Sequence, residues 1–358
     1  MALEKILFGT YTRRVSKGIY EAALNTETGE LQDAKLVAEV GSPTYLALSK
    51  ANKLYAVDKN GDQGGVGVFD FANDEATLTQ EVLAEGASPA YVAVDEARQL
   101  LYSGNYHKGT LEVFAIAADG SLTLTDSFQS EGSGPRPEQG SSHVHWNNLT
   151  PDNRVAVVDL GADKVLTFDV SDEGKLTLVA TFETEAGFGP RHLRFSPDGQ
   201  YAYLLGELSS KLSVLKYNAD GSFTLLQTVS TIPADWTEHN GGAAIYLSND
   251  GKFVYTSNRG HNSIAVFAVK DGGASVEHIQ WISTEGDFPR DFALNPSNEF
   301  LVAANQNTDN VTVYRRDAET GELTLSQKDY EIPESVRKEM QIILADNIDT
   351  VLDNALVR

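Results

Sequence analysis

The sequence contains no cysteine. This absence excludes disulfide bonds, thiolate metal sites and cysteine nucleophiles. The sequence also has no uninterrupted apolar run of about 18 residues or more, so no segment is predicted to span a membrane. Any chemistry must therefore come from His, Glu, Asp, Ser, Tyr, Lys or Arg side chains.

Basic residues are scarce, since Lys and Arg total 28 against 51 Asp and Glu, for a net charge of −23. This balance argues against a nucleic-acid partner, because phosphate backbones need Lys and Arg surfaces. A small anion can bind only where arginines are concentrated against the overall negative field.

The N-terminal segment lacks a basic region followed by an apolar core, which predicts a cytoplasmic protein. Neither a cofactor nor an oligomeric state is indicated.

A short pattern of alternating apolar and polar residues that ends in an aromatic or apolar side chain recurs along the chain. The copies lie 45 to 54 residues apart and align on Tyr20, Phe69, Phe114, Phe168, Leu215, Phe267 and Tyr314. Two further alternating runs precede most copies, and a Gly-x-Leu-Thr type run follows. Alternation over roughly five to seven residues, bounded by Gly, Asp, Asn and Pro, is typical of β-strands.

Seven repeats of four short antiparallel strands predict an all-β chain folded as a seven-bladed β-propeller. The segments SPDG at 196–199 and SND before Gly251 are predicted to be turns between the first two strands of their repeats. Residues 1–345 are assigned to the propeller. Residues 346–358 form a tail and are a candidate helix, because four apolar side chains fall on one helical face. They are Ile348, Val351, Leu352 and Leu356.

The first repeat begins at its second strand, so its first strand must come from the C-terminus if the ring is to close. The segment QIILA at 341–345 is the candidate for that closing strand. Alternatively, the closing strand is altered, and the fold is then weakened near Tyr11.

In a sheet of sequential antiparallel strands, the start of the first strand and the end of the second lie at the same end. Polar residues occur at both places in most repeats, which predicts that they gather at one mouth of the central channel. At strand starts these are His143, His145, Arg191, His192 and Arg290. At strand ends they are Asp58, Asn105, Tyr106, His107, Asp159, Glu207, Asn258, Arg259, Asn305 and Gln306. The N-terminal run adds Thr10, Tyr11 and Thr12.

Some of these residues have a structural explanation. Asp58, Asp159 and Asn305 are expected to satisfy turn and sheet-edge hydrogen bonds. His143 and His145, two residues apart, place both rings on one face of a strand, but no third ligand is evident and a metal site is not predicted. An ion pair between Arg191 and Glu207 would explain both charges as structural.

Four segments carry a resemblance to a known family: SHVHW, GPRHLRFSPDGQYAYLLGEL, AAIYLSNDGKFVYTSNRG and FPRDFALNPSNEFLVAANQNTD. Together with VTVYRRDAETGEL, they closely resemble the lactonase family of seven-bladed propellers. That family includes bacterial 6-phosphogluconolactonases and fungal 3-carboxy-cis,cis-muconate lactonising enzymes. The resemblance extends to about residue 325 and implies a reaction on an anionic small molecule that contains or forms a lactone.

By this resemblance the catalytic group is His143, Arg191, Glu207 and Arg259. Six of the other polar residues at the predicted mouth of the channel are assigned to substrate binding. They are Tyr11, His145, His192, Asn258, Arg290 and Gln306. The arginines are suited to clamping an anion or polarising a carbonyl, and either His143 or Glu207 could be the general base. Lactone hydrolysis is the first expectation. Lactonisation of a carboxylated muconate and a non-catalytic binding propeller are the alternatives.

Overall fold

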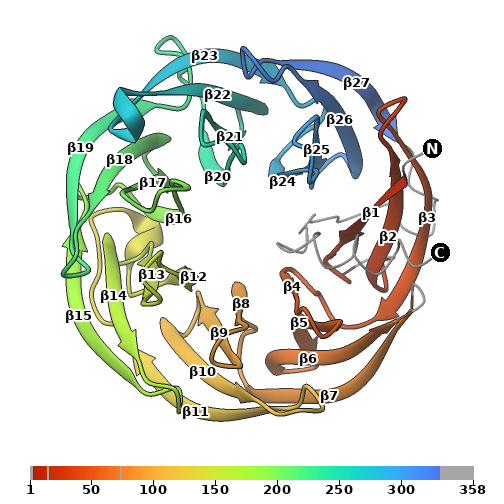
Figure 1. Ribbon diagram of the computed structural model, residues 1–358, viewed down its shortest axis with the longest axis vertical. Helices are drawn as coiled ribbons and strands as arrows, with labels where there is room; N and C mark the ends of the chain where they lie inside the picture. The colour runs from red at the N-terminus through yellow and green to blue at the C-terminus, as the bar shows by residue number, and fades with distance from the viewer. Residues whose placement is uncertain (1–2, 14–15, 73–74, 331–358) are drawn as a thin grey trace. The chain divides into compact units, whose positions relative to one another are not determined.

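The structure is a computed structural model that describes residues 3–13, 16–72 and 75–330. These residues belong to two compact units. The first lies within Met1–Ser88, Ala118–Ser121 and Ile282–Arg358, and the second within Pro89–Ala117 and Leu122–Trp281. Each unit is built from antiparallel sheets, whose strands Figure 1 labels in chain order.

The second unit contains four sheets, each made of four strands that follow one another in the chain. The first two sheets are β8 (Tyr91–Asp95), β9 (Leu100–Asn105), β10 (Thr110–Ile116) and β11 (Leu122–Gln129), then β12 (Val144–Leu149), β13 (Val155–Asp159), β14 (Lys164–Val170) and β15 (Leu176–Glu183). The other two are β16 (Pro190–Phe195), β17 (Tyr201–Gly206), β18 (Lys211–Tyr217) and β19 (Phe223–Ser230), then β20 (Gly241–Leu247), β21 (Phe253–Arg259), β22 (Ser263–Lys270) and β23 (Ser275–Ser283).

The first unit contains one three-stranded sheet and two four-stranded sheets. Their strands are β1 (Leu3–Phe8), β2 (Gly18–Asn25) and β3 (Glu30–Glu39), then β4 (Leu46–Leu48), β5 (Lys53–Asn60), β6 (Gln63–Ala72) and β7 (Glu75–Glu85), and β24 (Pro289–Leu294), β25 (Phe300–Asn305), β26 (Asn310–Arg316) and β27 (Leu323–Tyr330). The predicted strand pattern is therefore confirmed in all seven repeats, the first contributing three strands from the described residues. The proposed closing strand at 341–345 and the candidate helix at 346–358 lie outside the described residues.

Burial within the sheets follows the sequence pattern. The second and third strands carry the apolar runs and most of the buried residues. In β17 five of the six residues are buried, and in β18 the four residues from Leu212 to Leu215 are buried. The fourth strands, such as β19, expose most of their residues. Burying one Val, Leu or Phe side chain stabilises the fold by about 1.5–3 kcal/mol, so the middle strands supply most of the hydrophobic stabilisation.

The predicted turns between first and second strands are confirmed. The Ser196 hydroxyl donates to the Asp198 carboxylate at 2.6 Å, and Ser248 and Asp250 repeat this contact at the same distance. Gly199 and Gly251 have φ angles of +71° and +68°, which favour glycine over any other residue. These aspartates are thus used to build the turns.

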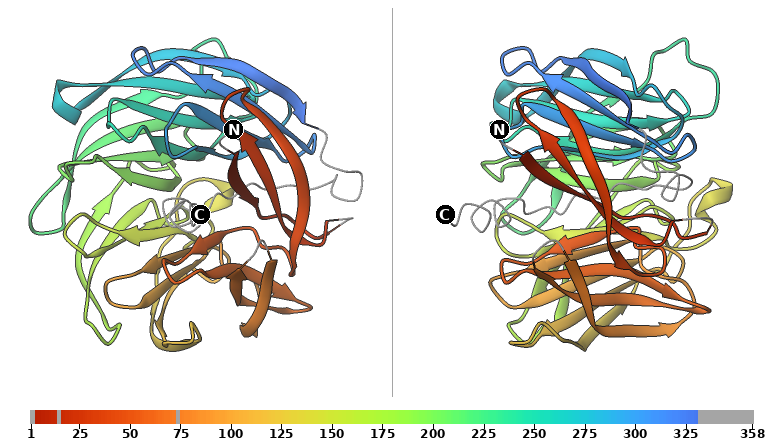
Figure 2. Two further views of the ribbon diagram at one scale, coloured as in Figure 1. Left: turned by 45° about the vertical axis from the view of Figure 1, so that its right-hand side comes forward. Right: turned by 90° about the vertical axis from the view of Figure 1, so that its right-hand side faces the viewer.

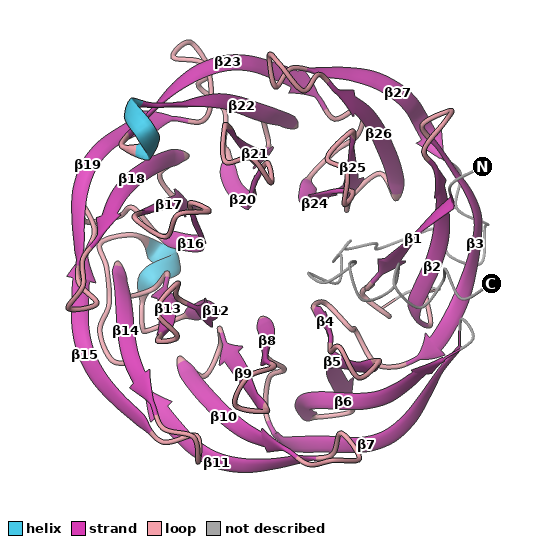
Figure 3. Ribbon diagram, viewed as in Figure 1, coloured by secondary structure: helices cyan, strands magenta, loops and turns pink. Residues whose placement is uncertain are grey.

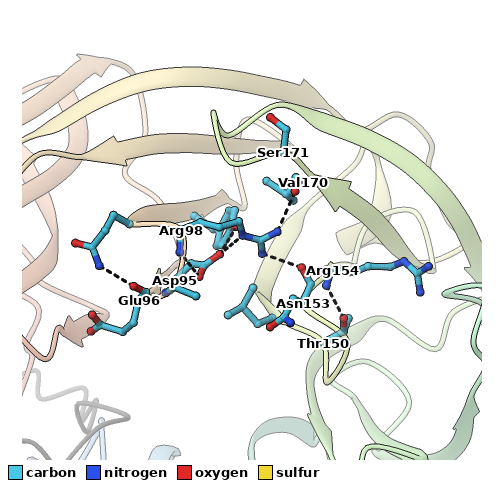
Figure 4. Close-up of polar contacts among 12 residues, drawn as sticks. Asp95, Glu96, Arg98, Thr150, Asn153, Arg154, Val170 and Ser171 are labelled. Carbon is cyan, nitrogen blue, oxygen red and sulfur yellow. Dashed lines mark hydrogen bonds and ion pairs between the residues drawn. The ribbon is translucent and has the colours of Figure 1, made fainter.

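Neighbouring sheets within the second unit pack through apolar side chains. One cluster joins β8–β11 to β12–β15 and includes Tyr102, Val113, Val144, Val157 and Phe168. A polar contact accompanies it, in which Arg98 binds across the same two sheets (Figure 4). The sheets are thereby held together by both apolar packing and directed hydrogen bonds.

Within the first unit, the first sheet of the chain packs beside the last one (Figure 2). The side chain of Gln327 accepts a hydrogen bond from the Leu31 backbone at 2.8 Å, and Asn295 donates to Glu4 at 2.9 Å. Two parts of the chain almost 300 residues apart are joined by these contacts.

The only helical elements among the described residues are two short 3-10 helices, η1 (Pro137–Gln139) and η2 (Asp271–Gly273) (Figure 3). No helix in residues 3–13, 16–72 and 75–330 has the length and apolar character needed to cross a membrane. The candidate site is therefore formed by strand ends and the loops that join them.

Candidate active site

The start of a first strand lies beside the end of the next strand, as the strand order predicts. Pro190 at the start of β16 pairs with Gly206 at the end of β17. The backbone N–H of Glu207 then donates to the carbonyl of Gly189 at 2.7 Å. This pairing brings Arg191 and Glu207 to the same end of their sheet.

A β-bulge directs side chains at this end of several sheets. In β12 the extra residue is His145, in β16 it is Arg191, and in β24 it is Arg290. A bulge turns its residue out of the regular alternation and is a common device beside active sites. Two of these bulged residues are arginines that follow a proline, which is the sequence signal for this position.

Glu207 binds two arginines at once. One carboxylate oxygen lies 2.9 Å from Nε of Arg191, and the other lies 2.9 Å from Nη2 of Arg259. Arg191 comes from the same sheet as Glu207, whereas Arg259 comes from the next sheet, at the end of β21. Arg191 also donates to the Ala243 carbonyl at 2.5 Å, and Arg259 to the Gly242 carbonyl at 2.9 Å.

The burial of these three side chains is unequal. Arg191 and Arg259 are only 2% and 6% exposed, whereas Glu207 is 22% exposed. Buried charges need partners, and a single carboxylate here faces two guanidinium groups. The trio keeps one net positive charge, which favours the binding of an anion or the stabilisation of negative charge that develops on a substrate.

The ring of His143 is held by Tyr106. The two rings stack with their centroids 4.2 Å apart and their planes at 6°. Nδ1 of His143 lies 2.8 Å from the backbone carbonyl of Tyr106. Because a carbonyl can only accept, Nδ1 carries the proton, and in the neutral ring Nε2 is left with the lone pair. Nε2 is therefore the nitrogen that can accept a proton if His143 acts as a general base.

Tyr106 is a site residue to which the sequence assigned no role. Burial raises the pKa of its phenol, the charges of Glu207 and Glu138 raise it further, and Arg191 and Arg259 oppose them. The phenol is therefore within electrostatic range of the Glu207 trio and stays protonated at neutral pH. Tyr106 directly follows β9, as Glu207 directly follows β17, and this shared position was the available signal.

His145 and His192 lie in a cluster of aromatic rings. The ring of His145 contacts those of Tyr106 and His192 at 5.7 and 5.1 Å, and Tyr91 meets His192 edge-on at 5.7 Å. Both histidines are buried. The bulge at His145 replaces the regular alternation expected for His143 and His145, although both rings contact Tyr106. Nε2 of His192 lies 3.3 Å from Nη1 of Arg191.

Other strand-end residues are used to hold the loops. Asp159 accepts hydrogen bonds from Ser130, Ser142 and the backbone N–H of His143 at 2.5 to 2.7 Å. Asn258 is fully buried and bonds Thr231 through both its oxygen and its nitrogen. Asn305 and Asp58 are also buried. This arrangement favours a structural role for Asn258 over substrate contact.

Tyr11, Arg290 and Gln306 belong to the first unit. The guanidinium carbon of Arg290 lies 5.8 Å from the centre of the Tyr11 ring. Gln306 donates its backbone N–H to the carbonyl of Phe288 at 2.9 Å. Among residues 3–13, 16–72 and 75–330, no three His, Asp or Glu side chains are grouped to hold a metal ion.

Comparison with known proteins gives a consistent result. A family model described as "Lactonase, 7-bladed beta-propeller" matches residues 5–340. The 6-phosphogluconolactonase of Bacillus subtilis is 42% identical over 331 residues, covering 91% of this chain and 95% of that protein. A solved structure from Lactobacillus plantarum is 58% identical with a TM-score of 0.91, covering 93% and 98%. The periplasmic gluconolactonase of Pseudomonas aeruginosa is 30% identical with a TM-score of 0.88, covering 95% and 98%.

Proposed function

The chain belongs to the lactonase family of seven-bladed β-propellers, and we propose that it hydrolyses a sugar lactone, with 6-phosphogluconolactone as the first candidate substrate. The seven antiparallel sheets are the blades, so the fold class predicted from the repeats is confirmed. A propeller fold alone does not specify a reaction. The names of two relatives, a 6-phosphogluconolactonase and a gluconolactonase, favour lactone hydrolysis.

The observation that carries the proposal is the Glu207 carboxylate shared by Arg191 and Arg259. It is joined by His143, whose Nδ1 donates to a backbone carbonyl and whose Nε2 keeps the lone pair in the neutral ring. Ester hydrolysis needs a base to activate water and positive charge to stabilise the oxyanion. Both kinds of group are present in the second unit, and they come from three consecutive blades.

In the proposed reaction, Nε2 of His143 takes a proton from water as the water oxygen attacks the lactone carbonyl carbon. The carbonyl oxygen becomes an oxyanion, which the guanidinium groups of Arg191 and Arg259 stabilise. The bond between that carbon and the ring oxygen then breaks. The imidazolium of His143 returns its proton to the ring oxygen, and the products are a carboxylic acid and a hydroxyl group on one open chain.

Glu207 has a different role in this proposal. Each of its oxygens is already engaged by an arginine, so it is better suited to orienting the guanidinium groups than to taking a proton from water. Tyr106 fixes His143 through ring stacking and its carbonyl. His192, in the aromatic cluster, contacts Nη1 of Arg191 through its Nε2 and helps to hold the guanidinium group in place.

Hydrolysis of 6-phosphogluconolactone would place the protein in glucose metabolism through the pentose phosphate pathway. The cytoplasmic location stays a prediction from the sequence. The product of this reaction is a gluconate that carries a phosphate group. A site for such a molecule needs positive charge, and the chain has only 28 Lys and Arg residues against 51 Asp and Glu residues.

The test is the rate of 6-phosphogluconolactone hydrolysis above the spontaneous rate, at neutral pH and with EDTA present. We expect a large excess rate for the wild type that EDTA leaves unchanged and that Arg191→Ala loses. An absent excess rate in folded wild-type protein would contradict the proposal. The carboxylated muconates and non-catalytic binding would then be examined in its place.

A further inference from the structure

The last sheet of the chain repeats the arrangement that holds Arg191 and Glu207. Arg290 is the bulged residue after Pro289, as Arg191 is the bulged residue after Pro190. Gln306 directly follows β25, as Glu207 directly follows β17. The two pairs of positions are therefore equivalent in their blades.

The backbone contacts support this equivalence. Glu207 donates its N–H to the carbonyl of Gly189, one residue before Pro190, at 2.7 Å. Gln306 donates its N–H to the carbonyl of Phe288, one residue before Pro289, at 2.9 Å. Both strand ends are thus fixed in the same way.

The difference between the two positions is one negative charge. Nε of Arg191 has the Glu207 carboxylate at 2.9 Å, but the equivalent residue beside Arg290 is the neutral Gln306. Nε of Arg290 and Oε1 of Gln306 are shielded from solvent and have no hydrogen-bond partner among the described residues. Leaving polar groups of this kind unpaired costs free energy, so Arg290 and Gln306 lack the compensation that Arg191 and Glu207 give each other.

A second arginine lies close to the same position. Arg13 and Arg290 both lie over the ring of Tyr11, at 4.4 and 5.8 Å from its centre. Within residues 3–13, 16–72 and 75–330, neither arginine forms an ion pair with an acidic side chain. Two like charges beside one ring are a repulsive arrangement that an anion would stabilise.

The backbone on both sides of Tyr11 is fixed. Thr10 is fully buried, and its hydroxyl bonds Ser16 and the Gly18 carbonyl. The side chain of Thr12 accepts a hydrogen bond from the Ser42 backbone at 3.0 Å. Tyr11 is therefore a preorganised platform for the two arginines, and preorganisation lowers the entropic cost of binding.

We propose that Arg13, Arg290, Tyr11 and Gln306 form an anion-binding site that takes a phosphate group. Two guanidinium groups match the charge of a phosphate dianion, and their forked donors match its oxygens. The existence of this site rests on the contacts in the first unit. Only the identification of its ligand with the phosphate of a sugar lactone rests on the proposed function.

The first experiment is a calorimetric titration of the full-length protein with inorganic phosphate at neutral pH and low ionic strength. Gln306→Glu should supply Arg290 with the carboxylate that Arg191 already has, and Arg290→Gln removes the cation. Each variant is expected to weaken phosphate binding by about 10-fold or more, the effect of losing one charge-assisted contact. Arg315→Ala is the matched control, because Arg315 lies over the Phe300 ring of the same unit.

The control should bind phosphate as the wild type does. Equal phosphate affinity in the wild type, Gln306→Glu and Arg290→Gln would overturn the proposal, and so would a wild type without saturable binding. Gln306→Glu adds a partner for Arg290, so this variant is expected to stay folded. An unchanged melting temperature then shows that its loss of phosphate binding is not caused by unfolding.

A second measurement identifies the source of the phosphate. The ratio of kcat/KM for 6-phosphogluconolactone to that for glucono-1,5-lactone is compared in the wild type and in Gln306→Glu. A ratio that falls together with phosphate affinity would assign the site to the substrate's phosphate. An unchanged ratio with lower phosphate affinity would assign it to a free anion. Wild-type protein without lactone turnover would contradict the proposed function while leaving the phosphate titration intact.

Discussion

The carboxylate of Glu207 lies 2.9 Å from Nε of Arg191 and joins the end of β17 to the start of β16. The ion pair that the sequence offered as a structural explanation is therefore present. It is also part of a larger group, because the second oxygen of Glu207 binds Arg259 of the next blade. The contacts of Glu207 stabilise the fold and also fix the orientation of the Arg191 and Arg259 guanidinium groups. They therefore have both a structural and a proposed chemical role.

Replacing Glu207 by Gln should destabilise the protein and impair catalysis. Two nearly buried guanidinium groups would lose their shared counter-charge, which costs about 3 kcal/mol in the free energy of unfolding. If the arginines are misaligned, kcat should fall by about 100-fold or more. Urea denaturation and lactone hydrolysis measure the two effects.

Glu185→Gln is the control for this prediction. Glu185 is 68% exposed and pairs with Lys211 at 2.9 Å, also in the second unit. Removing such an exposed pair should cost only about 0–1 kcal/mol. An equal loss of stability in both variants would contradict the view that Glu207 compensates buried charge.

His143→Asn should lower kcat by about 100- to 10,000-fold, the usual contribution of a general base, with a smaller change in KM. The melting temperature should change little, because His143 is only half-buried. His239→Asn, which changes an exposed histidine of the same unit, is the control. Near-normal activity of the His143 variant would reassign the base, with Glu207 the next candidate.

Arg98→Ala should lower stability without changing kcat/KM. Arg98 donates to the Asp95 carboxylate at 2.6 Å, to the Asn153 carbonyl at 2.8 Å and to the Val170 carbonyl at 2.9 Å (Figure 4). Losing these charge-assisted bonds, two of which reach the next blade, should cost about 3 kcal/mol in the free energy of unfolding.

Arg98→Lys separates charge from geometry. A lysine keeps the positive charge beside Asp95 but lacks the forked donors that reach both carbonyl groups. Its stability should lie between those of the wild type and Arg98→Ala. A lysine variant as stable as the wild type would show that the charge alone is sufficient.

Asp58 should make stability depend on pH. Burial and the nearby charge of Glu81 raise the pKa of the Asp58 carboxyl from 3.8 to about 6. Between these values the folded protein binds more protons than the unfolded chain. The contribution of Asp58 to stability is therefore full below pH 3.8 and is lost as the pH rises through about 6.

Asp58→Asn should remove this loss. At pH 7 the variant is expected to be more stable than the wild type by about 1–3 kcal/mol, and the difference should shrink towards pH 4. Urea denaturation across this pH range measures it. Asp62→Asn, a change to an exposed acid in the same unit, is the control. A stability difference that does not vary with pH would argue against the titration of Asp58.

The order of the strands and their assignment to repeats could be predicted from the sequence. Alternation and turn residues are local signals, and the side chain of Ser196 bonds that of Asp198 only two residues away. The placement of Arg191 and Glu207 at one end of a sheet also followed, because antiparallel pairing fixes which strand ends meet.

The contacts between blades could not be predicted in the same way. The bond from Arg259 to Glu207, the stacking of Tyr106 on His143 and the carbonyl that fixes the histidine tautomer each join different sheets. They depend on how the repeats pack and on bulges that shift the alternation by one residue. The sequence by itself therefore determined the repeats and the residue types at their ends. Tertiary packing decided which of those side chains meet, because residues in different repeats are positioned by the sheets that carry them.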